Sequence, residues 1–194
     1  MLRGDSPEGT TPIDENDIDG LLPGHIATQN QLNEWESANI LKASNRIPSV
    51  RGQKILTEGF VRELHHMMFD ETWKWAGQYR HRDMNIGIHW PGIREAVVQL
   101  CQNAIVWRDD GVFIPEEAAV RIHHRLVQIH PFPNGNGRHA RLFADLYLIK
   151  EQSPILTWGN VGRDDSTTRK KYLSALRLAD KGEFSELLHF CRAK

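Results

Sequence analysis

The sequence predicts a mainly α-helical bundle with one short β-hairpin. Apolar residues recur at three-and-four spacing through most of the chain, capping residues precede these segments, and strand-like alternation is confined to one stretch. With 194 residues and 40% apolar composition, the chain is long enough for one sizeable core. We expect an N-terminal arm rich in Gly, Pro and Asp over residues 1–27 and a single domain over residues 28–194.

Two helices are expected before the alternating stretch. Thr28 opens a capping box, so a first helix should begin there and end near Ser44. Thr57 should cap a second helix whose apolar residues are three or four apart. His65 and His66 are adjacent on this helix and point to different faces, so we expect one packed and one exposed histidine rather than a metal site.

The helical period disappears between Tyr79 and Pro91. Met84, Ile86 and Ile88 alternate with polar residues or glycine, which predicts a strand and hence a short hairpin. The backbone of an exposed hairpin can hold an extended peptide by pairing with it as an added strand. The alternative is a plain surface hairpin without a binding role.

The second half of the chain is expected to be helical on both sides of one loop. Helices are predicted over residues 92–109, from Pro115, from about Asn136 to Lys150, from Ser166, and from Phe184. The segment His130–Arg141 reads HPFPNGNGRHAR and joins the second of these helices to the third. Its loop therefore leads the chain into a helix N-terminus.

This helix N-terminus has the composition of an anion-binding site. The first N–H groups of a helix have no intrahelical acceptor and lie at the positive end of its dipole. Gly135 and Gly137 lack a Cβ, so the backbone on either side of Asn136 can adopt positive φ and approach a ligand closely.

Three side chains add to this prediction. Arg138 and Arg141 are three residues apart on the new helix, so they share a face and offer planar donors suited to phosphate oxygens. Two arginines beside a helix N-terminus indicate a polyphosphate ligand. His130 lies at the other end of the loop, where an imidazole is suited to take a proton from a hydroxyl that attacks phosphorus.

The segment resembles the signature of the Fic family, His-x-Phe-x-(Asp/Glu)-Gly-Asn-Gly-Arg-x-x-Arg. The matching residues are His130, Phe132, Gly135, Asn136, Gly137, Arg138 and Arg141. Asn134 departs from the acidic residue of the pattern. The upstream segments 60–65 and 75–80 are also similar to the family, so the resemblance covers about residues 57–151. Within the family, the chain looks closest to the small proteins called mobile mystery protein B.

The resemblance implies a Fic-type bundle that transfers AMP from ATP to a Ser, Thr or Tyr hydroxyl of a target protein, or of the chain itself, and releases pyrophosphate. His130 would be the base. The nest of Gly135, Asn136 and Gly137 would hold the α-phosphate, and Arg138 and Arg141 the outer phosphates. Phe132 would be buried beneath the loop. The hairpin would be the flap over the active site, and its residues nearest the target are Asn85, Ile86, Gly87 and Ile88.

Asn134 stands where the family has its magnesium ligand. An amide oxygen can coordinate Mg²⁺ or Mn²⁺, directly or through water, but brings no negative charge. The resemblance therefore implies weaker metal affinity or lower turnover for this chain.

A second family pattern occurs near the N-terminus. Many Fic proteins carry (Ser/Thr)-x-x-x-Glu-(Gly/Asn), whose glutamate pairs with the first arginine of the signature and blocks the γ-phosphate site. Thr11, Glu15 and Asn16 fit this short pattern, so inhibition by Glu15 against Arg138 is one hypothesis. A capped helical turn is the alternative.

Composition adds few constraints. A formal net charge of −1 and a pI near 6.8 give no overall attraction to nucleic acid or anionic membrane. No apolar run has the length of a signal peptide or a membrane span, so we expect a cytoplasmic protein. Cys101 and Cys191 lie far apart in apolar contexts and are expected to be buried free thiols.

Two other functions stay open. One is a non-catalytic Fic module that binds a nucleotide or a protein partner, with Asn134 marking the lost chemistry. The other is a Fic enzyme with an altered reaction, either removal of AMP or phosphoryl transfer. Gly137 disfavours phosphoryl transfer, because the Doc relatives have lysine at that position.

Overall fold

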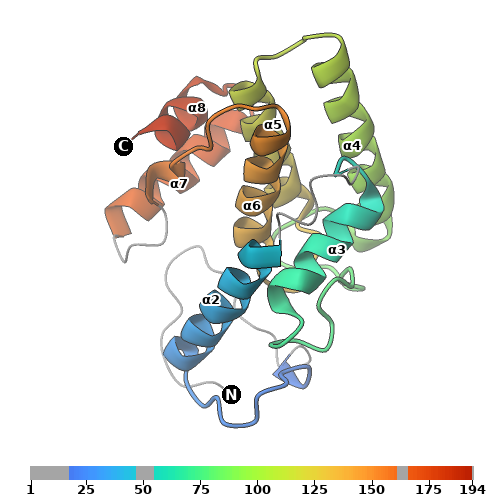
Figure 1. Ribbon diagram of the computed structural model, residues 1–194, viewed down its shortest axis with the longest axis vertical. Coiled ribbons are helices and arrows are strands. Elements are labelled where there is room, and N and C mark those ends of the chain that lie inside the picture. The colour runs from blue at the N-terminus through green and yellow to red at the C-terminus, as the bar shows by residue number, and fades with distance from the viewer. Residues whose placement is uncertain (1–17, 47–54, 161–165, 194) are drawn as a thin grey trace.

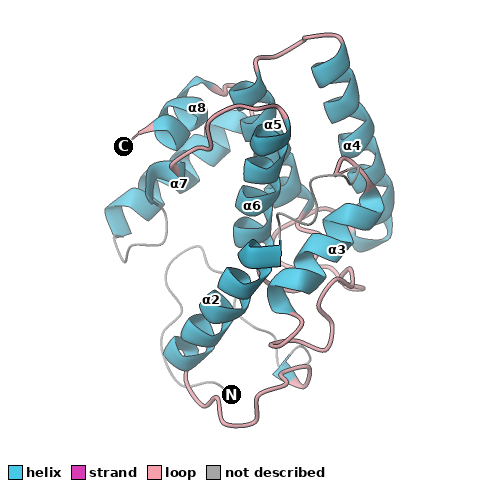
Figure 2. Ribbon diagram, in the orientation of Figure 1, coloured by secondary structure: helices cyan, strands magenta, loops and turns pink. Residues whose placement is uncertain are grey.

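The computed structural model describes residues 18–46, 55–160 and 166–193. These residues form helices joined by loops (Figure 2). The helices are α2 (Gln29–Arg46), α3 (Glu58–Phe69), α4 (Ile93–Asp109), α5 (Pro115–Ile129), α6 (Asn136–Lys150), α7 (Ser166–Ala179) and α8 (Ser185–Arg192), with short 3₁₀ turns η2 (Trp90–Gly92) and η3 (Trp158–Asn160). The predicted mainly helical class is therefore confirmed.

Helices α5 and α6 pack side by side at the centre of the molecule (Figure 1). Helix α4 packs against α5 on one side, and α7 and α8 pack together on the other. Helix α3 packs against α2, α4 and α6. None of the described helices combines the length and the apolar character needed to cross a membrane.

The predicted caps set the observed helix starts. The Thr28 Oγ1 atom accepts the Gln31 N–H at 3.3 Å and the Gln31 side chain accepts the Thr28 N–H at 3.1 Å, which is a capping box. Thr57 Oγ1 accepts the Phe60 N–H at 3.1 Å and so caps α3. Helix α2 ends at Arg46 rather than near Ser44.

The buried apolar core takes side chains from every described α-helix. The largest fully buried side chains include Phe69, Trp73, Phe132, Phe143 and Tyr147. Each large apolar side chain that leaves water contributes about 1.5–3 kcal/mol, so this cluster is a firm support for the loop between α5 and α6. Cys101 and Cys191 are buried free thiols, as predicted.

Residues 18–27, the described part of the predicted arm, bond to the segment that follows α3. The Leu22 N–H donates to the Thr72 carbonyl at 2.9 Å, and the Lys74 N–H donates to the Gly20 carbonyl at 2.8 Å. An isolated antiparallel bridge between Leu21 and Trp73 lies beside these bonds. Thr11, Glu15 and Asn16 lie outside the described residues.

The prediction of a β-hairpin between Tyr79 and Pro91 is wrong. Residues 81–89, which we call the flap loop, form bends without strand pairing. The Arg80 guanidinium donates to the carbonyls of Arg82 and Ile88 at 2.8 and 2.5 Å, so an arginine takes acceptors that a hairpin would have used. The alternation in the sequence had suggested a strand, but the loop bonds to a side chain instead of to itself.

Candidate active site

His130 lies at the junction of α5 and the loop, in an uncommon backbone conformation. It is the C-cap of α5, with φ 53° and ψ 61° in the left-handed region, and its N–H donates to the Leu126 carbonyl at 3.0 Å. A left-handed conformation costs a residue other than glycine about 1–2 kcal/mol. Such a conformation persists where the surroundings fix it, and it occurs often at functional sites.

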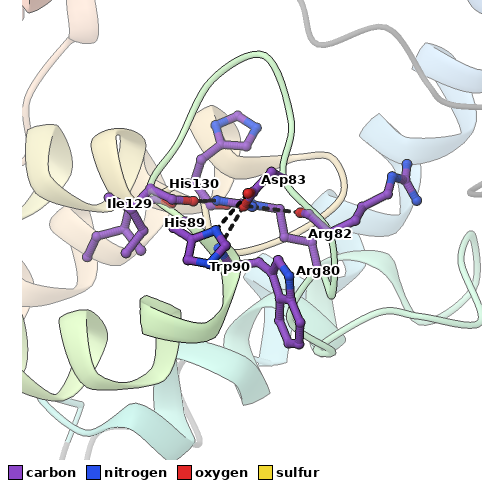
Figure 3. Close-up of polar contacts among 8 residues, drawn as sticks. Arg80, Arg82, Asp83, His89, Trp90, Ile129 and His130 are labelled. Atoms are coloured by element: carbon purple, nitrogen blue, oxygen red, sulfur yellow. Dashed lines mark hydrogen bonds and ion pairs between the residues drawn. The ribbon is translucent and has the colours of Figure 1, made fainter.

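Arg80 provides much of that fixation. Its Nε donates to the His130 carbonyl at 2.7 Å, and its backbone N–H donates to the Pro131 carbonyl at 2.9 Å. Figure 3 shows the imidazole of His130 pointing away from this guanidinium. Gly87 of the flap loop packs on the same residues, because a Cβ added there would lie 2.8 Å from His130 Cβ and 2.7 Å from Arg80 Nη2.

His130 is held in its neutral form. Burial and, to a smaller extent, the positive charge of Arg80 lower its pKa to about 4, although a hydrogen bond with the Val127 carbonyl opposes them. A neutral imidazole can accept a proton. An anionic ligand bound nearby would raise this pKa and make the imidazole a stronger base.

The turn after His130 is closed by side-chain bonds to the backbone. Asn136 donates through Nδ2 to the Phe132 carbonyl at 2.7 Å and accepts the Phe132 N–H at 2.9 Å through Oδ1. The fully buried Phe132 stacks on His65, with ring centroids 3.7 Å apart and planes at 21°. The Asn136 amide therefore shapes the loop, while its backbone belongs to the first turn of α6.

His65 connects this loop to the segment before the flap loop. The Gly77 N–H can only donate, so at 3.0 Å from His65 Nδ1 it fixes that nitrogen as an acceptor. His65 Nε2 therefore carries the hydrogen and donates to the Asn134 carbonyl at 3.1 Å. As predicted, one of the adjacent histidines is packed and the other, His66, is exposed.

The two glycines of the segment behave differently. Gly135 is the N-cap of α6 with φ 77°, and a Cβ added there would lie 2.6 Å from the Phe69 ring. The expectation that Gly137 also uses positive φ is wrong, because it lies inside the first turn of α6. Gly135, the N-cap, has no side chain that could cap this helix, and the first N–H groups of such a helix are suited to bind an anion.

The two arginines meet different partners. Arg138 Nη1 lies 2.8 Å from Glu36 Oε2, and its guanidinium stacks over the Phe69 ring at 5.2 Å. Glu36 is 2% exposed and also accepts the Trp73 indole N–H at 2.8 Å. Arg141 is bonded to the Tyr172 hydroxyl, which lies 2.9 Å from His123 Nε2.

The comparisons with known proteins agree with this geometry. Residues 55–148 match the Fic/DOC family. The chain contains a Fic/DOC domain. It is 28% identical over 118 residues to the protein adenylyltransferase fic-1 of Caenorhabditis elegans, covering 59% of this chain and 22% of that protein. It is 30% identical over 118 residues to the protein adenylyltransferase Fic of Nematostella vectensis, with 59% and 26% coverage.

A solved Fic-family structure has the same fold. The BepC protein of Bartonella tribocorum, crystallised with bound AMPPNP, superposes with a TM-score of 0.66 and 16% identity over 92% of this chain and 97% of that chain. This likeness concerns the fold alone. The chain spans about a quarter or less of the length of the two adenylyltransferases named above.

The acidic position of the Fic/DOC signature is occupied here by a side chain that already has a partner. Asn134 Oδ1 accepts the Gly135 N–H at 2.6 Å. Within residues 18–46, 55–160 and 166–193, no group of three or more His, Cys, Asp or Glu side chains could hold a metal ion.

Three residues of the site were not identified from the sequence. Arg80 was part of a segment similar to the family but had no role, and Tyr172 was only an apolar position of a helix. Glu36 lies more than a hundred residues from its partner Arg138. Helical spacing does not report such a pairing, and no local signal marks it.

A cavity of about 200 Å³ lies elsewhere in the Fic/DOC domain, between α4, α5 and Phe184. Two of its polar lining groups already have partners, since Arg121 lies 2.8 Å from Glu117 and His124 lies 2.9 Å from Asp180. None of its lining residues belongs to the His130–Arg141 segment.

Proposed function

We propose that this chain is a protein adenylyltransferase that transfers AMP from ATP to a Ser, Thr or Tyr hydroxyl of a target protein. The hydroxyl oxygen attacks the α-phosphorus, and the bond from that phosphorus to the bridging oxygen breaks. Pyrophosphate leaves with that oxygen, and the hydroxyl proton passes to the His130 imidazole. The reaction balances without an oxidant or reductant.

The observation that carries this proposal is the pairing of a neutral, rigidly held imidazole with an uncapped helix N-terminus. His130 closes α5, and five residues later Gly135 opens α6 with no side-chain cap. The first supplies a base, and the second supplies backbone donors for the phosphate that the hydroxyl attacks. The chain is also similar to proteins named adenylyltransferases and to a Fic structure that holds AMPPNP.

The two arginines are suited to the outer phosphates. Arg141 is held by Tyr172 and is partly buried, so its guanidinium is already oriented. Arg138 is available only when the phosphates displace Glu36 or share the arginine with it. Backbone groups of the flap loop at Asn85, Ile86 and Gly87 would hold the target peptide beside His130. The backbone groups of Ile88, which were expected to share this role, already bond to Ile129 and Arg80.

A divalent cation, Mg²⁺ or Mn²⁺, would arrive with the triphosphate. Because Asn134 offers only an amide oxygen that already accepts the Gly135 N–H, most ligands of such a cation must be phosphate oxygens and water. The cation would neutralise phosphate charge. We therefore expect Asn134→Asp to lower the Mg²⁺ concentration that gives half-maximal labelling.

The direct test is transfer of label from α-labelled ATP, with Mg²⁺ or Mn²⁺, onto the chain itself or onto lysate proteins. Label should appear with wild type and vanish with His130→Ala, and mass spectrometry should find AMP on a hydroxyl side chain. His66→Ala is a matched control, because this exposed histidine lies outside the site. Label that persists in His130→Ala would refute the assignment of the base.

A second candidate is a Fic module that binds nucleotide without transferring AMP. Two contacts favour this candidate. Asn134 accepts the Gly135 N–H, and Arg138 pairs with Glu36, so Asn134 and Arg138 already have partners inside the protein. It predicts that calorimetry detects ATP binding while no label is transferred with either metal. Transferred label would exclude it.

A further inference from the structure

Arg80 makes an unusual number of backbone contacts for one side chain. Besides the His130 carbonyl at 2.7 Å, its guanidinium reaches the carbonyls of Arg82, Ile88 and Ile129 at 2.8, 2.5 and 3.4 Å. The residue is 3% exposed. Figure 3 shows these contacts converging on the guanidinium from the flap loop and from the end of α5.

These contacts satisfy a charge that burial would otherwise penalise. The nearest carboxylate is Asp83, at 3.8 Å from Arg80 Nη1, and that side chain is about half exposed. A buried charge must be compensated by hydrogen bonds or by an opposite charge. Backbone carbonyls provide most of the compensation here, which ties their positions to the guanidinium.

The carbonyls belong to the two segments that must be aligned for transfer. Those of Ile129 and His130 precede the loop, and those of Arg82 and Ile88 lie at either end of the flap loop. Asp83 closes the flap loop as well, accepting the Trp90 N–H at 2.8 Å and lying 2.7 Å from His89 Nδ1. Gly87 then packs against His130 Cβ without room for a side chain.

We propose that Arg80 is a positioning residue that holds His130 in its left-handed backbone conformation and seats the flap loop on it. The same guanidinium thereby fixes both the proposed base, His130, and the flap loop that would contact the target peptide. This inference rests on the proposed role of His130, but the support itself can be measured without any reaction. A merely structural arginine would stabilise the fold and leave kcat unchanged once the protein is folded.

The electrostatic surroundings of His130 make the difference measurable. Among the described charged groups, Arg80 is the one whose charge acts on the His130 pKa, and Asp83 faces Arg80 from the flap loop. Substituting Arg80 by glutamine removes the charge and the guanidinium together. Substituting it by lysine keeps the charge and removes the planar set of donors.

The first experiment is an NMR titration of ¹⁵N-labelled histidine side chains in wild type, Arg80→Gln and Arg80→Lys. In wild type the His130 pKa should lie near 4. In Arg80→Gln it should rise but stay below 6.5, because burial is the larger cause of the shift and remains, and in Arg80→Lys it should stay depressed. Arg108→Gln is the control, because this partly exposed arginine on α4 pairs with Asp109 and should leave His130 unchanged. An unchanged titration in folded Arg80→Gln overturns the inference.

The second experiment measures labelling kinetics for the same variants. Misplacement of the base by about 1 Å should lower kcat on the order of a hundredfold. The KM for ATP should change by less than about twofold, because the phosphate ligands lie on α6. If Arg80→Gln does not fold, the kcat of Arg80→Lys is the test, and a kcat equal to that of wild type in Arg80→Lys overturns the inference. If wild type itself transfers no label, the proposed function fails while the NMR titration still tests Arg80.

Discussion

Arg138 is already paired in the absence of a nucleotide. Its partner Glu36 is buried and is held in place by the Trp73 indole, so the pair is built into the packing of α2 on the site. A triphosphate must therefore compete with a carboxylate for this arginine. The hypothesis that Glu15 fills this role stays untested, because residue 15 lies outside the described ranges.

Replacing Glu36 by glutamine should release this competition. Glutamine keeps an oxygen that accepts the Trp73 N–H, and it removes only the charge that faces Arg138. We expect the Kd for ATP to fall roughly two- to tenfold, because Arg138 is about one-third exposed and its ion pair is partly screened. Calorimetry measures this change. Glu34→Gln, exposed on the same helix, is the control, and equal Kd values in the two variants would contradict the argument.

Gly135 should tolerate no side chain. Its φ of 77° is strained for alanine by about 1–2 kcal/mol, and the new Cβ would collide with the Phe69 ring at 2.6 Å. Gly135→Ala should therefore lower the free energy of unfolding by at least that amount. Gly59→Ala is the matched control, because Gly59 lies within α3 with nothing within 4 Å of its added Cβ. Urea titration should show Gly59→Ala equal to or more stable than wild type by roughly 0.5–1 kcal/mol.

At the scale of elements, α3 contacts both the loop between α5 and α6 and the segment that precedes the flap loop. His65 on this helix joins the Gly77 N–H to the Asn134 carbonyl and stacks on Phe132. Thr57 fixes the start of the helix and hence the register of that histidine. The loop geometry thus depends on a helix that contributes no group to the proposed reaction.

His65→Phe separates hydrogen bonding from packing. The ring is retained, but a buried N–H and a buried carbonyl each lose a partner, at a cost of about 1–3 kcal/mol apiece. We expect the free energy of unfolding in urea to fall by roughly 2–5 kcal/mol. His66→Phe on the next position should lower it by only about 1 kcal/mol, because that exposed side chain loses a single bond, from Nδ1 to the Ala76 carbonyl. Similar losses in both variants would show that packing alone explains the role of His65.

The helices could be predicted because their signals are local. Thr57 and Pro115 mark helix starts, and Gly135 precedes a helix that begins at Asn136 as expected. The flap loop could not be predicted, because the partner of its carbonyls is the side chain of Arg80 rather than another strand. The pairing of Glu36 with Arg138 is likewise set by how α2 packs in three dimensions, which periodicity does not encode.

At the scale of the whole molecule, the fold buries an unusual group of neutral histidines. Burial lowers the pKa of His65, His123, His124, His130 and His139, and for the last two the value is about 4. In the unfolded chain a histidine titrates near 6.5, so below that pH the unfolded chain binds more protons. The stability contributed by these groups is therefore fully present above pH 6.5 and is lost as pH falls towards 4.

Asp145 opposes this trend. Burial raises its pKa to about 6, although the Trp158 indole N–H bond and Arg141 act in the other direction. The folded chain therefore binds a proton at Asp145 more readily than the unfolded chain, whose aspartates titrate near 3.8. Protonation of Asp145 thus raises the free energy of unfolding as pH falls from 6 to 3.8. One such group offsets only part of the effect of several histidines.

The free energy of unfolding should thus fall by at least about 2 kcal/mol between pH 7 and pH 4.5. Urea titrations at fixed ionic strength measure it. Asp145→Asn removes the opposing group while keeping an oxygen for the Trp158 N–H, so its loss over the same range should exceed that of wild type by up to about 2 kcal/mol. A flat dependence of the unfolding free energy on pH in wild type would mean that the histidines have the same pKa values in the folded and the unfolded chain. A variant profile parallel to that of wild type would remove Asp145 from the balance and leave the histidines alone responsible for the acid sensitivity.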